Sequence, residues 1–142
     1  MIRPYNESDR EKLLELCKEF WVGTCLEYGD FDYEHTATKL DLYLDNGICL
    51  VADDVSGFIL LCETTALCSN TPMAAEVAWY VTPSARGRSG IDLLNAAFKY
   101  CEVKGIKLLS MMYMESSMPA SIERIYKKAG MTLRETTYVK RF

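Results

Sequence analysis

Two arginines and two glycines alternate in a short segment that could bind an anionic group. The segment is Arg86-Gly87-Arg88-Ser89-Gly90, which lies between a strand-like stretch ending at Val81 and the start of a helical pattern. Backbone amides at such a turn can point toward one position, where the helix dipole adds to their attraction for an anion. Glycine permits positive φ, and arginine adds charge-assisted hydrogen bonds. The segment predicts a pyrophosphate site, although a plain strand-to-helix turn with a solvated basic face explains the same residues.

Aromatic and acidic residues alternate between residues 21 and 45. A surface with both kinds of side chain attracts a cation by charge and by cation–π contact. The charge distribution agrees, because residues 1–71 carry 5 basic and 14 acidic side chains, whereas residues 72–142 carry 11 and 6. An ordinary amphipathic, solvated segment would show the same pattern. The residues concerned are Trp21, Tyr28, Phe31 and Tyr33, together with Glu27, Asp30, Asp32 and Glu34.

Hydrophobic periodicity and turn signals indicate the elements that must position these residues. A capping box at Ser8 and Glu11 predicts a helix ending near Gly23, and a second helix is predicted over residues 33–44. A second capping pair, Ser89 and Asp92, predicts a helix that ends at Gly105, with Ile91, Leu94, Phe98 and Cys101 on its buried face. Strands are predicted over residues 2–3, 48–52, 57–67, 74–81, 108–114 and 136–141, and a last helix from Pro119 to Gly130.

This order of elements predicts an α+β fold. Hairpin strands lead into a strand-helix-strand crossover, so a mixed, mostly antiparallel central sheet with helices on both faces is the economical arrangement. A length of 142 residues predicts a single domain over residues 1–142.

Composition predicts an ordinary globular protein of the cytoplasm. Hydrophobic residues make up 49% and charged residues 25% of the chain, and no apolar run approaches the roughly 20 residues of a membrane span. The first residues do not resemble a signal peptide. Six cysteines form no CxxC pair and there is one histidine, so we expect no metal site.

The segment Val81-Thr82-Pro83-Ser84-Ala85-Arg86-Gly87, with this order of elements, resembles the acetyl-CoA-binding segment of the GNAT superfamily of N-acetyltransferases. Tyr126, shortly before Gly130 on the last predicted helix, resembles the family's second hallmark. The resemblance covers essentially the whole chain and is to the small single-domain members, a phage-type member being one expectation. The chain departs from the pattern at Ser89 and Ile91, where the family has glycines, and at Pro119, where it often has asparagine.

The resemblance implies an enzyme that transfers an acetyl group from acetyl-CoA to a primary amine by direct attack in a ternary complex. The pantetheine arm would lie between the strands over residues 74–81 and 108–114. The acceptor would be a cationic small molecule or protein, with no nucleic acid or membrane partner, and the chain would be a monomer or homodimer. Acceptor contacts are implied for Trp21, Tyr28, Asp30 and Asp32, and cofactor contacts for Trp79, Tyr80, Val81, Arg86, Gly87, Arg88, Ser89, Gly90 and Ile91.

Proton transfer in such a reaction would fall to Glu76 and Tyr126. A lysine-like amine has a pKa near 10.4, so it must lose a proton before it attacks, and Glu76 is the expected base, directly or through water. Tyr126 would donate a proton to the departing CoA thiolate. A strand carboxylate paired with a neighbour and a packed aromatic ring are the alternatives for these two residues.

Three other functions stay open. The chain could be a catalytically silent GNAT-fold binding or regulatory protein. It could modify charged tRNA, which the net charge of −9 in the first half disfavours. It could also be an unrelated regulatory domain with no affinity for CoA.

Overall fold

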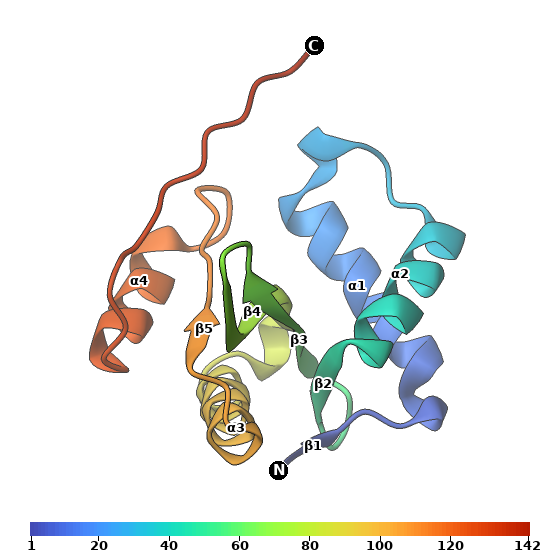
Figure 1. Cartoon of the computed structure of the whole chain (residues 1–142). Coiled ribbons are helices and arrows are strands. Elements are labelled where there is room, and N and C mark those ends of the chain that lie inside the picture. The colour runs from blue at the N-terminus through green and yellow to red at the C-terminus, as the bar shows by residue number, and fades with distance from the viewer. The chain divides into compact units, whose positions relative to one another are not determined.

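The computed structural model describes all 142 residues, which form two compact units, residues 1–112 and residues 113–142. The first unit contains a sheet and three helices, and the second contains one helix (Figure 1). In chain order the elements are β1 (Ile2–Pro4), α1 (Arg10–Thr24), α2 (Tyr33–Asp45), β2 (Gly47–Ala52), β3 (Gly57–Ala66), β4 (Ser69–Val81), α3 (Arg88–Lys104), β5 (Leu108–Ser110) and α4 (Pro119–Lys128), with short 3-10 turns at Glu7–Asp9, Leu26–Tyr28 and Pro83–Ala85. None of the helices is both long enough and apolar enough to span a membrane.

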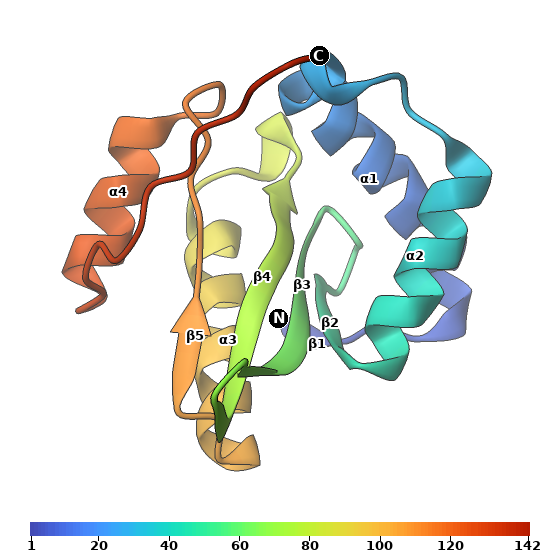
Figure 2. The ribbon, with the colours of Figure 1, turned by 45° about the horizontal axis from the view of Figure 1, so that its top comes forward.

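The five strands form one sheet in the order β1-β2-β3-β4-β5. Every neighbouring pair is antiparallel except β4 and β5, which are parallel. Helices α1 and α2 cover one face of the sheet and α3 covers the other (Figure 2). The α+β fold with a mixed, mostly antiparallel sheet is therefore confirmed.

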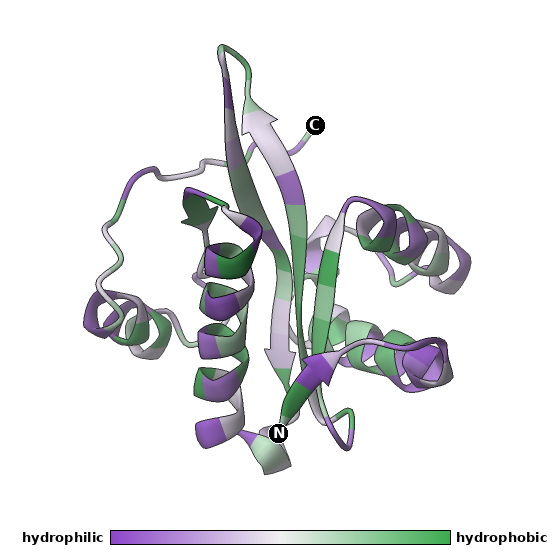
Figure 3. Cartoon of the chain, turned by 60° about the horizontal axis from the view of Figure 1, so that its bottom comes forward, coloured by the Kyte–Doolittle hydropathy of each residue, from purple (hydrophilic) through white to green (hydrophobic).

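A hydrophobic cluster lies on each face of the sheet, because the inner strands are apolar in both directions. Leu13, Leu14 and Leu40 pack against Val51 and Phe58 on the face of α1 and α2. Leu93, Ala97 and Cys101 of α3 pack against Ile59 and Leu61 on the other face. Figure 3 shows hydrophobic residues along the central strands, as burial on both faces requires.

The start of α1 differs from the expected capping box. Asn6 is the cap of the preceding 3-10 turn: its side chain accepts from Ser8, and the Asp9 carboxylate reaches back to the Asn6 amide. The box at Ser8 and Glu11 is therefore wrong, because the same kind of motif occurs two residues earlier and the helix begins as a continuation of that turn.

Asp9 also links this turn to the edge strand β1. Its carboxylate accepts two hydrogen bonds from the Arg3 guanidinium, at 2.7 and 2.9 Å, and one from the Asn6 amide at 3.0 Å. The Asp9 side chain is 7% exposed. The bond from Arg3 lowers the pKa of Asp9, with a further contribution from the Asn6 amide.

We expect Asp9→Asn to lower the free energy of unfolding by about 2 kcal/mol at pH 7, because it weakens hydrogen bonds to a buried charge. Since the folded pKa of Asp9 is depressed, its contribution is fully present above the unfolded pKa of about 4 and is lost as pH falls through the lower folded value. Urea unfolding of both proteins between pH 7 and pH 2 measures this.

Asp41→Asn is the matched control. Asp41 also pairs with an arginine, Arg10 at 2.7 Å, but its side chain is 58% exposed, so the loss of stability should be much smaller than for Asp9→Asn. A difference between Asp9→Asn and wild type that did not shrink in acid would contradict the assigned role of Asp9.

The helix α3 ends at Gly105 as expected, in the left-handed conformation. Its start carries no side-chain cap, so the second predicted capping pair is wrong. The predicted buried face is right at Leu94 and Cys101, but Ile91 is 36% exposed and Phe98 is half-buried. The buried stripe instead includes small residues such as Ala97, which hydrophobicity alone does not mark.

The strands β4 and β5 also differ from expectation. The strand β4 begins at Ser69 and forms a long hairpin with β3, whose tip holds the fully exposed Leu67 and the exposed Cys68. The strand β5 stops at Ser110, because its pairing with β4 ends there.

In the second unit, α4 begins at Pro119, carries an ion pair between Lys127 and Glu123 at 3.0 Å, and is followed by Gly130 at φ 82°. These features match the prediction for this helix. Residues 136–141 form no strand, which corrects that prediction: β-propensity alone does not make a strand without a hydrogen-bonded neighbour.

Candidate functional site

The parallel strands β4 and β5 separate after a short ladder. Their pairing begins at Met73 and Leu108 and ends at Ala75 and Ser110. From Glu76 to its end, β4 continues beside β3 without a further rung on the β5 side. This half of β4 therefore borders a gap in the sheet. The backbone N–H and C=O groups on that side of the strand have no β5 ladder to bond to.

A bulge in β4 coincides with the point of separation. Leu61 pairs with Glu76 and Leu60 pairs with Ala78, so Val77 is an extra residue in the strand. A bulge shifts the alternation of side chains by one residue. As a result, Val77 and Ala78 both contact the cluster under α1 and α2. Trp79 then lies on the face covered by α3.

The three residues at the end of β4 alternate after the bulge. Trp79 and Val81 pack with α3, whereas Tyr80 packs toward α1, where its ring centroid is 6.1 Å from that of Phe20. The Tyr80 hydroxyl donates to Glu19 at 3.3 Å. Burial, with the nearby Glu19 carboxylate, raises the pKa of Tyr80.

Glu76 lies at the mouth of the separation. Its side chain is buried, with the residue 8% exposed, and its Oε2 accepts a hydrogen bond from the backbone amide of Met112 at 3.1 Å. Met112 follows β5 by two residues. The Glu76 carboxylate thus links β4 to the chain beyond β5. Sequence reasoning missed Met112, because a backbone amide carries no signal in the residue type.

The loop from β4 to α3 presents the first amides of a long helix. Gly87 is the N-cap of α3, at φ 115° and ψ −116°, a conformation that only glycine adopts readily. No side chain caps the first turn, so its amides can donate hydrogen bonds to an anion. Gly90 lies within α3 and does not have positive φ, which corrects the expectation for that glycine; a Cβ there would meet the Trp79 ring at 3.6 Å.

Both arginines of the loop are on the surface. The Arg86 Nε donates to the carbonyl of Val81 at 3.3 Å, which folds this side chain back over the strand end. The Arg88 side chain is 92% exposed and lies 3.6 Å from Asp92. Ile91 is at the surface of the first turn.

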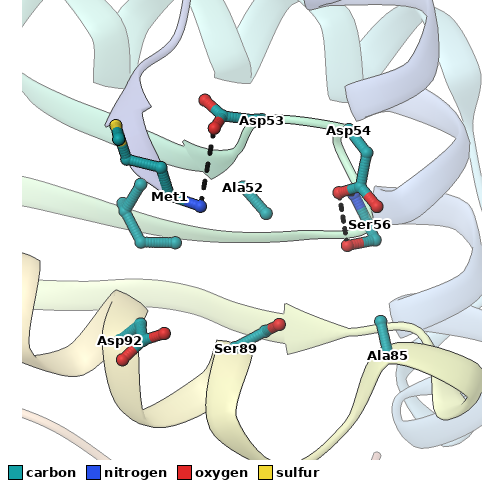
Figure 4. A pocket seen from close by; sticks show the side chains of 9 residues that line it. Met1, Ala52, Asp53, Asp54, Ser56, Ala85, Ser89 and Asp92 are labelled. Carbon is teal, nitrogen blue, oxygen red and sulfur yellow. Dashed lines mark hydrogen bonds and ion pairs between the residues drawn. The ribbon is translucent and has the colours of Figure 1, made fainter.

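A hollow of about 380 Å³ lies beside the first turn of α3 (Figure 4). It is lined by Met1, Ile2, Ala52, Asp53, Asp54, Ser56, Ala85, Ser89 and Asp92. Of its three carboxylates, Asp53 pairs with the Met1 ammonium at 3.5 Å and Asp92 pairs with Arg88 at 3.6 Å, so Asp54 is the one that would repel a phosphate most. The side chain of Ser89 faces this acidic hollow, so any contact of Ser89 with a phosphate falls to its backbone amide.

The predicted acceptor residues lie at the link between α1 and α2. The Trp21 indole donates to the carbonyl of Gly29 at 2.8 Å, and its ring centroid is 6.4 Å from that of Tyr28, which is 51% exposed. Asp30 is exposed. Asp32 caps α2: its carboxylate accepts a hydrogen bond from the His35 amide at 2.8 Å. This residue therefore also stabilises the start of the helix.

Tyr126 belongs to the second unit, where it is the buried residue of α4. The first unit brings together Glu76, the end of β4 and the loop up to Ile91. No group of three or more His, Cys, Asp or Glu side chains in the chain could hold a metal ion.

Solved structures of acetyltransferases share this fold over the whole chain. An aminoglycoside N-acetyltransferase, AAC(6')-Iy in complex with CoA, superposes with a TM-score of 0.76 at 19% identity, covering 100% of this chain and 93% of that one. A ribosomal-protein-alanine N-acetyltransferase from Brucella melitensis gives 0.75 at 16% identity, with 100% and 99% covered. A GNAT family acetyltransferase from Staphylococcus aureus gives 0.71 at 16% identity, with 100% and 98% covered.

No protein-family model matches the chain, and no curated protein matches its sequence. The likeness is therefore one of fold: the chain has the GNAT acetyltransferase fold. The expectation of a phage-type member finds no support among these structures.

Proposed function

We propose that this chain with the GNAT fold is an acetyl-CoA-dependent N-acetyltransferase that acts on a cationic amine. The observation that carries the proposal is the combination of the strand separation after Ala75 with the uncapped first turn of α3 at Gly87. The separation offers backbone groups to an extended pantetheine arm, and the helix start offers amides to a pyrophosphate. CoA is a ligand that needs both.

The cofactor would contact the end of β4 and the loop that follows it. Backbone groups of Trp79, Tyr80 and Val81 would bind the arm and polarise the thioester oxygen. Amides from Gly87 to Ile91 would bind the pyrophosphate, with Arg86 and Arg88 adding charge. Both arginines lie on the surface, where Arg86 would exchange its bond to the Val81 carbonyl for one to the phosphate.

In the proposed reaction the free amine attacks the thioester carbon, a C–N bond forms, and the C–S bond to CoA breaks. Glu76 would take the proton of the amine, directly or through water, and Tyr126 would donate a proton to the leaving thiolate. Burial of Glu76 at the mouth of the separation supports the first role. The role of Tyr126 rests on the family resemblance and on its position in α4.

A turnover assay tests the proposal. Purified protein with acetyl-CoA should release CoA when an acceptor from a panel of polyamines, aminoglycosides, amino acids and basic peptides is added. Binding of CoA without release of product from any of them would favour the silent binding protein instead. No affinity for CoA would contradict both.

We expect Gly87→Ala to weaken CoA binding about tenfold. A side chain at φ 115° strains the backbone by about 1–3 kcal/mol, and relief of that strain would turn the amides of the first turn away from the pyrophosphate. Calorimetric titration with CoA measures the change.

Gly105→Ala is the control for strain alone. Gly105 also has positive φ, 75°, but lies at the other end of α3. It should lower the melting temperature and leave CoA affinity unchanged. Equal affinity in the Gly87 and Gly105 variants would remove the loop from the cofactor site.

We expect Asp30→Lys to raise the KM for the preferred acceptor and to spare CoA affinity. An acidic acceptor surface attracts a cation over about 10 Å at 0.1 M ionic strength, so KM in the wild type should also rise with salt. Asp32 is left unchanged because it caps α2.

Glu102→Lys carries the same change of charge on α3 and should leave KM unaltered. An acceptor KM that is indifferent to salt and to Asp30→Lys would show that the acidic segment is only a solvated surface.

A further inference from the structure

The link between Glu76 and Met112 occupies the place of a missing sheet rung. The regular β4–β5 ladder ends at Ala75 and Ser110, and the next amide beyond the ladder that has a partner across the gap is that of Met112. In a continued parallel ladder this amide would bond to a backbone carbonyl of β4. Here a side-chain carboxylate on β4 accepts the bond instead.

A side-chain acceptor requires the two strands to lie farther apart than a backbone acceptor does. Backbones joined by a ladder lie about 4.8 Å apart, whereas a glutamate side chain between them adds its own length to the separation. β4 and β5 lie side by side at the ladder (Figure 2), so the gap opens just where the side chain takes over.

The hydrogen bond from the Met112 amide also compensates a buried charge. Burying the carboxylate of a residue that is 8% exposed costs free energy unless hydrogen bonds compensate it, and a bond to an ionised acceptor is among the stronger ones. The bulge at Val77 directly follows Glu76 and disturbs the pairing of β4 with β3. The carboxylate therefore anchors β4 next to one of its two irregular points.

We propose that Glu76 is a positioning residue for the cofactor: through the Met112 amide it holds open the space between β4 and the chain after β5 in which the pantetheine arm of CoA would lie. This role rests on the proposed function and is separate from proton transfer. It assigns to Glu76 an effect on CoA affinity that a general base alone would not have.

Two variants separate these roles. Glu76→Gln keeps an oxygen that can accept from Met112, whereas Glu76→Leu keeps a similar volume and removes the acceptor. Hydrogen exchange of the Met112 amide, measured by NMR without CoA, should be unchanged in Glu76→Gln and about tenfold or more faster in Glu76→Leu. CoA affinity, measured by calorimetry, should stay within about twofold in Glu76→Gln and fall about tenfold in Glu76→Leu.

Glu63→Leu is the matched control. Glu63 on β3 accepts a hydrogen bond from Tyr100 and pairs with Lys104 at 3.8 Å, so this variant also removes a bonded carboxylate from the sheet. It should change neither the exchange of Met112 nor the affinity for CoA.

Several outcomes would overturn the inference. Wild-type exchange at Met112 in Glu76→Leu, or wild-type CoA affinity in that variant, would show that the bond does not hold the cleft. If Glu76→Leu fails to fold, loss of CoA affinity in Glu76→Gln, which keeps the acceptor oxygen, would overturn the inference. A wild-type protein that protects Met112 but does not bind CoA would overturn the proposed function, and the cofactor role of Glu76 with it.

Discussion

Glu76→Gln is expected to lower kcat for acetyl transfer by about 10²–10³-fold while CoA affinity is retained. Removal of a general base typically costs this much, because the proton must then leave the amine without a positioned acceptor. Glutamine can still accept the bond from Met112 at the position where the carboxylate does so at 3.1 Å. The loss should therefore fall on kcat and not on cofactor binding.

The pH dependence gives the same prediction a second readout. Without a base, the reaction uses the fraction of acceptor that is already neutral, which rises tenfold per pH unit below an amine pKa of about 10. The rate of Glu76→Gln should follow that slope from pH 6 to pH 9, and the deficit relative to wild type should shrink as pH rises. Undiminished kcat at pH 7 would remove Glu76 as the base and leave it only its positioning role.

Gly47→Ala is expected to destabilise the fold by about 3 kcal/mol. Gly47 opens β2 opposite Cys62, and a Cβ there would lie 1.9 Å from the carbonyl oxygen of Leu61. That oxygen is part of the central backbone and cannot move as a side chain can, so β2 and β3 must separate. A drop in melting temperature of roughly 10 °C should follow for a chain of this size.

Gly23→Ala provides the contrast. Gly23 lies in α1 with no atom within 4 Å of the position of its missing Cβ. Alanine there should raise stability by about 0.5–1 kcal/mol, since glycine is a poor helix residue. Thermal unfolding followed by circular dichroism measures both variants. A Gly47 variant as stable as wild type would mean that the strands accommodate the methyl group.

Local signals predicted most of the fold. Residues 33–44 as the second helix, the turn between β2 and β3, Gly105 as the end of α3 and Pro119 as the start of α4 all depend on neighbours close in sequence. The errors arose where tertiary pairing decides. The length of β5 depends on where β4 turns away, and residues 136–141 lack a partner strand.

The site was harder to predict for one reason, the bulge at Val77. Strict alternation from Ala74 would place Trp79 on the face of α1, whereas the extra residue places it beneath Gly90 of α3. A bulge is defined by how two strands pair, and no single residue type in β4 predicts it. The link from Glu76 to Met112 depends on the same geometry. The residue types at the site could therefore be identified from the sequence, but the contacts between them could not.

The exposed tip of the β3–β4 hairpin makes the native chain ready for thiol labelling. Only the thiolate reacts with a maleimide, and burial raises the pKa of Cys17 to about 11 and raises those of Cys25, Cys49 and Cys101 as well. Cys62 is half-buried within β3, whereas Cys68 is exposed at the turn. A fluorophore can thus be attached first at Cys68 without any substitution, at the end of the hairpin whose other strand leads to Glu76 and the loop of α3.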